Sequence, residues 1–118
     1  LVDMVLDNPV IFDYERRDPM LAAKGFDVVR EIWSDDKDLN DPIISPLYDD
    51  LKNLGKISIF TGTHEALFPD NMKLDQKLNE QGAAHNTYVY PKMNHVFVLM
   101  PVPEAKDAHK KIMEIINN

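Results

Sequence analysis

Two short apolar segments, separated by one helix-forming segment, constrain the fold of this chain most. Lys56–Thr61 (Lys-Ile-Ser-Ile-Phe-Thr) and Thr87–Tyr90 (Thr-Tyr-Val-Tyr) are rich in the β-branched and aromatic residues that favour strands. Between them, Leu74 and Leu78 stand at helical spacing, and Gly82 follows as a helix-terminating residue. With a last helix after the second strand, the order predicts a βαβα unit, whose two strands are parallel and joined by a right-handed crossover.

The remaining segments predict helices and loops around this unit. Asp18-Pro19 combines an N-cap acid with a proline suited to the first helical position, so a helix is expected to start there. In the last helix, apolar residues recur on one face. The expected elements are a helix from Asp18 to Trp33, a loop over 34–48, one helical turn over Asp49–Leu54, and the last helix after Pro103.

A sheet of two or three mostly parallel strands leaves strand edges unpaired and relies on other elements to cover its faces. The fold class is therefore predicted as α/β, in one partial domain over residues 1–118. Such a unit is either a piece of a larger sheet or one that self-associates.

Composition excludes several classes of function. The net charge of −7 argues against nucleic acid as a partner, because phosphate binding needs clustered Lys and Arg. No apolar run approaches the roughly 20 residues of a membrane-spanning helix. The absence of cysteine excludes disulfides and zinc–thiolate sites and fits a reducing compartment, so we expect a cytoplasmic protein. No motif predicts a cofactor or a metal.

An acid and a histidine follow the two predicted strands. Glu65 comes shortly after the first strand and His95 shortly after the second. Reactive side chains in open α/β sheets lie at the carboxyl ends of strands, where these two residues are expected to meet. A carboxylate bonded to one imidazole nitrogen fixes the tautomer, and the order acid then histidine matches the end of the hydrolase order Ser…acid…His. Asp70 is a rival acid, although an N-cap role for Asp70 or Asn71 is the better interpretation.

Four short sequence segments, which include Glu65 and His95, resemble segments of a known family. In order, they are Arg17-Asp-Pro-Met20, Asp41-Pro-Ile-Ile-Ser-Pro-Leu-Tyr48, Gly62-Thr-His-Glu-Ala-Leu-Phe-Pro-Asp70 and Tyr90-Pro-Lys-Met-Asn-His-Val-Phe97. Together they resemble the C-terminal third of the hormone-sensitive-lipase-like α/β-hydrolases, which are carboxylesterases acting on short acyl esters. The resemblance implies a cap-proximal connecting region over 1–54 and the terminal βαβα unit over 55–118.

The resemblance also implies roles for single residues. In that family the acid follows the penultimate strand and the histidine follows the last one, which places them at Glu65 and His95. Two positions depart from the family pattern: Glu65 stands where many members have Asp, and Val96 stands where glycine is frequent. Met20, Phe26 and Trp33 either line an acyl pocket or pack in the core.

Other parts of the family's machinery are missing from the sequence. None of the three serines, Ser34, Ser45 and Ser58, lies in a Gly-x-Ser-x-Gly motif, and no His-Gly-Gly stretch could supply an oxyanion hole. We therefore expect a fragment of an esterase that is inactive by itself.

Alternatives to an enzyme fragment remain open at this stage. One is a non-catalytic α/β interaction module that completes its sheet by homodimerisation through exposed edges. A weaker one is a flavodoxin-like or receiver-like domain. Glu65 as a solvated loop carboxylate and His95 as a surface histidine are the corresponding non-catalytic interpretations. The three other histidines, His64, His85 and His109, show no metal-binding spacing and are expected to have no catalytic role.

Overall fold

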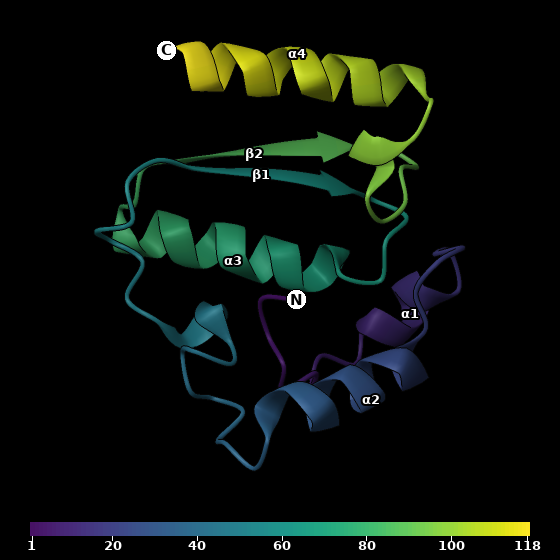
Figure 1. The fold of residues 1–118 in the computed structure, drawn as a ribbon, viewed down its shortest axis with the longest axis vertical. Helices are drawn as coiled ribbons and strands as arrows, with labels where there is room; N and C mark the ends of the chain where they lie inside the picture. The colour runs from purple at the N-terminus through teal and green to yellow at the C-terminus, as the bar shows by residue number, and fades with distance from the viewer.

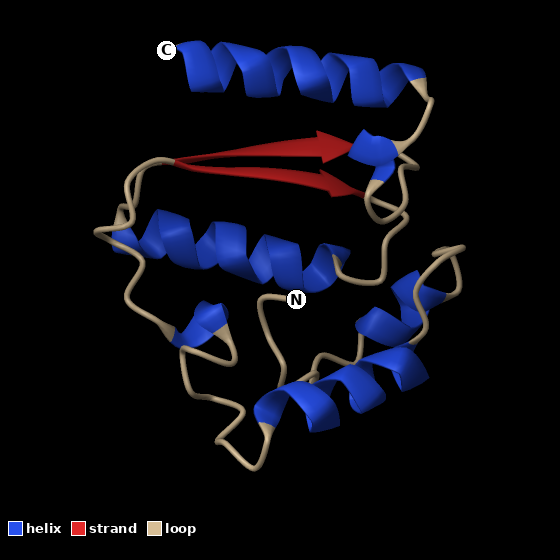
Figure 2. Cartoon of the chain, in the orientation of Figure 1, coloured by secondary structure: helices blue, strands red, loops and turns tan.

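The computed structural model describes all of residues 1–118, and it confirms the predicted α/β class (Figure 2). None of its helices combines the length and the apolar character needed to cross a membrane. In chain order the elements are α1 (Ile11–Glu15), α2 (Ala23–Ser34), a 3-10 turn (Pro46–Tyr48), β1 (Ile57–Gly62), α3 (Phe68–Gln81), β2 (His85–Tyr90), a second 3-10 turn (Phe97–Leu99) and α4 (Pro103–Asn117).

The sheet consists of β1 and β2, which pair in parallel as predicted. The pairing runs in register from Ile57 opposite His85 to Gly62 opposite Tyr90, so both strands end at the same edge. Helices α3 and α4 lie on opposite sides of the sheet, which gives three layers (Figure 1). The loops after β1 and β2 therefore start side by side.

Each face of the sheet has its own apolar cluster, because side chains alternate along a strand. On the α3 side, Ile57 and Ile59 pack with the completely buried Leu78. On the α4 side, Phe60 and Tyr88 pack with Ala108. The rings of Phe60 and Tyr88 stack with their centroids 4.6 Å apart. These two clusters hold the strands between the helices that the sequence predicts on either side.

The N-terminal half attaches to this unit through an apolar cluster and a polar one. Ile11 of α1 and Phe26 of α2 pack against Ala66 and Leu67, which lie between β1 and α3. In the polar cluster, the fully buried carboxylate of Asp3 lies 3.7 Å from the ammonium group of Lys73 on α3 and accepts hydrogen bonds from the Tyr48 hydroxyl at 3.3 Å. Burial and the negative charge of Asp3 raise the pKa of Tyr48 to about 12, so the hydroxyl remains a donor to this carboxylate.

Several predicted boundaries are wrong. Helix α2 starts at Ala23 rather than Asp18, because Asp18 closes a turn with the N–H groups of Met20 and Leu21. Glu15 instead accepts the bond from the Ala23 N–H, at 2.8 Å. The helical turn predicted over Asp49–Leu54 is absent, and the short helix α1 was not predicted. Strand β2 starts two residues earlier than Thr87.

A close approach of backbone joins the two strand-end loops. A Cβ atom at Gly62 would come within 2.0 Å of the Met93 carbonyl oxygen, which no real side chain tolerates. The same carbonyl accepts a hydrogen bond from the His64 N–H at 2.9 Å, and the Thr63 hydroxyl accepts one from the Lys92 N–H at 2.8 Å. Gly62 is therefore required so that the loop after β2 can lie directly on the end of β1.

We predict that substitution by alanine has opposite effects on the free energy of unfolding at two glycine positions. Gly62→Ala should lower the free energy of unfolding by about 1–3 kcal/mol or more, because the loops must separate to admit the methyl group. Gly25→Ala is the matched control: nothing lies within 4 Å of its added Cβ, and the position is inside α2. That variant should gain about 0.5–1 kcal/mol from helix propensity. Urea denaturation of both variants measures this, and equal stability of the two would contradict the account.

Candidate active site

The acid and the histidine predicted from the sequence lie together at the carboxyl edge of the sheet. The Nδ1 atom of His95 lies 3.3 Å from the Oε2 atom of Glu65. Glu65 is 4% exposed, whereas the His95 side chain is one-third exposed. This bond to Glu65 is the only side-chain hydrogen bond of His95, so Nε2 remains free to act on a ligand. The arrangement can orient an imidazole and stabilise its protonated form.

The second oxygen of Glu65 has two further partners that the sequence analysis missed. Its Oε1 atom accepts hydrogen bonds from the Thr61 hydroxyl and from the Asn71 amide, both at 2.6 Å. Thr61 ends the apolar face of β1, and Asn71 lies in the first turns of α3. Nothing in the local sequence shows these bonds, because they join three separate elements.

Asp18 supports the loop that carries the acid. Its Oδ2 atom accepts a hydrogen bond from the Ala66 N–H at 2.8 Å, across 48 positions in the sequence. Its Oδ1 atom accepts from the N–H groups of Met20 and Leu21. One carboxylate thus fixes both the residue after Glu65 and the turn that carries Met20.

Asp70, the rival acid, lies elsewhere. It is 1% exposed in the first turn of α3, and its Oδ1 atom accepts a hydrogen bond from the Asn8 amide at 3.2 Å. Burial raises the pKa of this carboxyl, and its Oδ2 atom has no partner. The predicted N-cap role for Asp70 or Asn71 is wrong, because α3 already begins at Phe68, with Pro69 in its first turn. The structure brings Glu65, not Asp70, to His95.

The residue after His95 has a strained backbone. Val96 has a φ of 51°, in the left-handed region that a β-branched side chain disfavours. It precedes the 3-10 turn Phe97–Leu99 and its carbonyl accepts from the Leu99 N–H. The departure from glycine noted in the sequence therefore falls on a position where glycine is the natural residue.

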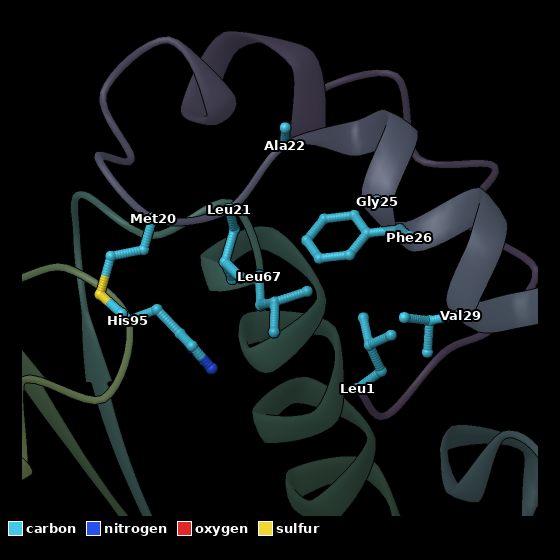
Figure 3. A pocket seen from close by; sticks show the side chains of 9 residues that line it. All are labelled: Leu1, Met20, Leu21, Ala22, Gly25, Phe26, Val29, Leu67 and His95. Atoms are coloured by element: carbon cyan, nitrogen blue, oxygen red, sulfur yellow. The ribbon is translucent and has the colours of Figure 1, made fainter.

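A pocket of about 440 Å³ opens beside His95 (Figure 3). Figure 3 shows His95 and Met20 at one end of the pocket and Val29 and Leu1 at the other. Phe26 lines the pocket and also belongs to the apolar cluster under α2, so both interpretations of this residue apply. Trp33 lies outside it, in a separate hollow with Ile43 and Ile44. The lining is mostly apolar: Leu1, Met20, Leu21, Ala22, Gly25, Phe26, Val29, Leu67 and His95.

The other histidines lie outside this arrangement. His85, at the opposite end of β2, contacts the Ala83 carbonyl through Nδ1 and Asp75 through Nε2. His109 is exposed on α4. His64 adjoins Glu65, but it enters the site through its backbone N–H, which binds the Met93 carbonyl.

Comparison with known proteins identifies the class. Residues 3–99 match the model of a protein family whose description is "alpha/beta hydrolase fold". The chain is 26% identical over 116 residues to an esterase of Acinetobacter venetianus strain RAG-1, covering 96% of this chain and 38% of that esterase.

Solved structures agree. EstE5, in crystals soaked with ethyl alcohol, superimposes with a TM-score of 0.92 at 29% identity, covering 98% of this chain and 40% of EstE5. EstE7, a homologue of hormone-sensitive lipase from a metagenome library, superimposes with a TM-score of 0.92 at 28% identity. The match covers 98% of this chain and 41% of EstE7. A Staphylococcus aureus protein described as a putative esterase superimposes with a TM-score of 0.91 at 27% identity. The match covers 99% of this chain and 40% of that protein.

The chain therefore belongs to the α/β-hydrolase fold family, and its resemblance to the hormone-sensitive-lipase-like esterases is confirmed. It spans about 40% of the length of these relatives. The activity of a whole esterase is thus a separate question from the fold of this part.

We predict that Val96→Gly stabilises the chain by up to about 1.5 kcal/mol. The left-handed conformation costs roughly 1–2 kcal/mol for a residue with a Cβ atom, and this gain exceeds the entropy cost of glycine of about 0.5–1 kcal/mol. Val89 is the control, since it is similarly exposed (42% against 37%) but lies in the extended strand β2. Val89→Gly should destabilise the folded chain. Thermal unfolding of both variants tests this, and a loss of stability in Val96→Gly would contradict the strain.

Proposed function

We propose that this chain supplies the acid and the base of a carboxylic-ester hydrolase acting on short acyl esters. The observation that carries the proposal is the 3.3 Å contact between Glu65 Oε2 and His95 Nδ1 at the ends of two parallel strands. The relatives' names as esterases support it.

The chemistry assigns one role to each residue. His95 Nε2 would take the proton of a serine hydroxyl as the serine oxygen bonds to the ester carbonyl carbon, and it would then give this proton to the departing alcohol. Water would repeat the sequence on the acyl-enzyme, releasing the acid and the serine. Glu65 would stay ionised throughout and stabilise the imidazolium.

The nucleophile must come from polypeptide outside these 118 residues. None of the chain's three serines bonds to His95: Ser45 is fully buried and accepts a hydrogen bond from the Met4 N–H, and neither Ser34 nor Ser58 contacts the imidazole through a hydrogen bond. Five large apolar side chains are more than 60% exposed, namely Ile32, Trp33, Ile43, Leu99 and Ile116. Such a surface favours coverage by further polypeptide. We place the enzyme in the cytoplasm, as the lack of cysteine in these 118 residues favours.

The apolar pocket beside His95 fits the acyl part of the substrate. Met20 and Phe26 belong to its wall, and an acyl chain lying there would hold the ester carbonyl near Nε2. No resident cofactor is needed for this reaction.

We predict the effect of three substitutions on the complete reading frame that contains this chain, assayed with p-nitrophenyl acetate and butyrate. His95→Ala should lower kcat/KM by at least about 1,000-fold, because no base then activates the serine. Glu65→Gln should lower it by about 100-fold or more, through loss of the imidazolium partner. His109→Ala, an exposed histidine on α4, is the control and should keep the full rate.

Near-normal turnover in His95→Ala would refute the proposal, as would an active enzyme whose rate depends on Asp70 rather than Glu65. The 118-residue chain alone should be inactive in the same assay.

The free outer edges of β1 and β2 favour one alternative, a homodimer that extends the sheet without catalysis. Light scattering after size exclusion distinguishes it. A mass twice the 13.6 kDa of one chain favours the module, and a monomer excludes edge pairing.

A further inference from the structure

We infer that Thr61 and Asn71 are positioning residues that hold Glu65 in the one orientation in which it faces His95. The inference rests on the proposed function, because it assigns a purpose to the Glu65–His95 contact. It concerns two residues that do not touch the histidine.

The three side chains form a closed hydrogen-bonded triangle. The Thr61 hydroxyl donates to Glu65 Oε1 at 2.6 Å, and the Asn71 amide nitrogen donates to the same oxygen at 2.6 Å. The same amide nitrogen also donates to the Thr61 hydroxyl oxygen at 3.0 Å. Each of the three side chains therefore bonds to the other two. The reversed amide would place its oxygen against the carboxylate, which fixes the orientation of Asn71.

The triangle follows from the packing of the fold. Side chains alternate along β1, so Thr61 lies on the same face as Ile57 and Ile59, which pack against α3. Asn71 stands three and seven positions before Leu74 and Leu78, on the face of α3 that meets the sheet. The apolar layer between β1 and α3 therefore ends in a polar pair beneath the acid.

Burial gives these bonds their effect. Thr61 is fully buried and Glu65 is 4% exposed, so water does not compete for Oε1. Charge-assisted hydrogen bonds in such a place are stronger than neutral ones and rigid in direction. With Oε1 held by two donors, rotation of the carboxylate is blocked and Oε2 alone is presented to His95 Nδ1. A glutamate, with one more rotatable bond than aspartate, depends on such anchoring.

The test measures the tautomer of His95 in the 15N-labelled 118-residue chain, in alkaline solution where imidazole is neutral. A glutamate fixed at Nδ1 requires the proton on that nitrogen, whereas free imidazole prefers it on Nε2. Long-range 1H–15N correlation spectra distinguish the two forms, and His95→Gln identifies the signals. His85 is an internal reference, because it bonds to Ala83 and Asp75 away from the triangle.

We expect the Nδ1–H form to dominate in the wild type. Thr61→Val, which removes only the hydroxyl, and Asn71→Leu should each reduce its fraction at least twofold. Thr61→Ser keeps the hydroxyl and should retain the wild-type fraction. Asn79→Leu is the control on α3, since Asn79 bonds only to Asp75 within its own helix.

The outcomes separate the inference from its premise. An unchanged tautomer in a folded Thr61→Val or Asn71→Leu chain overturns the positioning role of that residue, since a donor that merely satisfies a buried oxygen would leave Nδ1 protonated. If Thr61→Val fails to fold, Asn71→Leu, at a partly exposed site, decides the matter. Wild-type His95 in the Nε2–H form would instead remove the Glu65–His95 bond, and with it the proposed function. In the complete enzyme both variants should lower kcat by up to about 100-fold with little change in KM.

Discussion

The structure depends most on the contact between Gly62 and the Met93 carbonyl. Because Gly62 has no side chain, the loop after β2 lies directly against the end of β1, with the Met93 oxygen where a Cβ atom would otherwise be. Parallel pairing brings the two strand ends level, and this contact brings the two loops together. Glu65 and His95 meet only because both conditions hold. A site assembled by backbone packing in this way is more rigid than one formed by two free loops.

A second set of interactions fixes the orientation of the Glu65 carboxylate. Thr61 and Asn71 bind one carboxylate oxygen, and Asp18 binds the N–H of the next residue, Ala66. These three supports come from β1, from α3 and from the turn before α2, so both the N-terminal half and the βαβα unit contribute to the position of Glu65. His95 has fewer supports, and its neighbour Val96 is strained. Strain of this kind persists when the surrounding structure over-determines the backbone.

The sequence predicted the βαβα unit because its strands and helices carry strong local patterns. Ile57 and Ile59 on one face of β1, and Leu74 and Leu78 on α3, define the interface that the structure contains. The pairing of Glu65 with His95 was predictable from strand order taken together with the family resemblance, because strand order alone leaves Glu65 as well explained by a solvated loop carboxylate. The start of α2 was not, because Asp18 binds Ala66 rather than the helix.

Asn71 was missed for the same physical reason: its partners are set by tertiary packing, not by local sequence. Val96 was recognised as a departure from the family pattern. Its left-handed backbone, however, depends on the loop packed against β1, which no local signal specifies.

The central claim is that His95 is the general base for a serine outside this chain. Its most direct measurement is covalent labelling of the complete reading frame with a fluorophosphonate, followed by intact-protein and peptide mass spectrometry. The account predicts one adduct, on a serine other than Ser34, Ser45 and Ser58, and a labelling rate that falls by orders of magnitude in His95→Ala. Labelling at the same rate in that variant, or no serine adduct in the wild type, would contradict it.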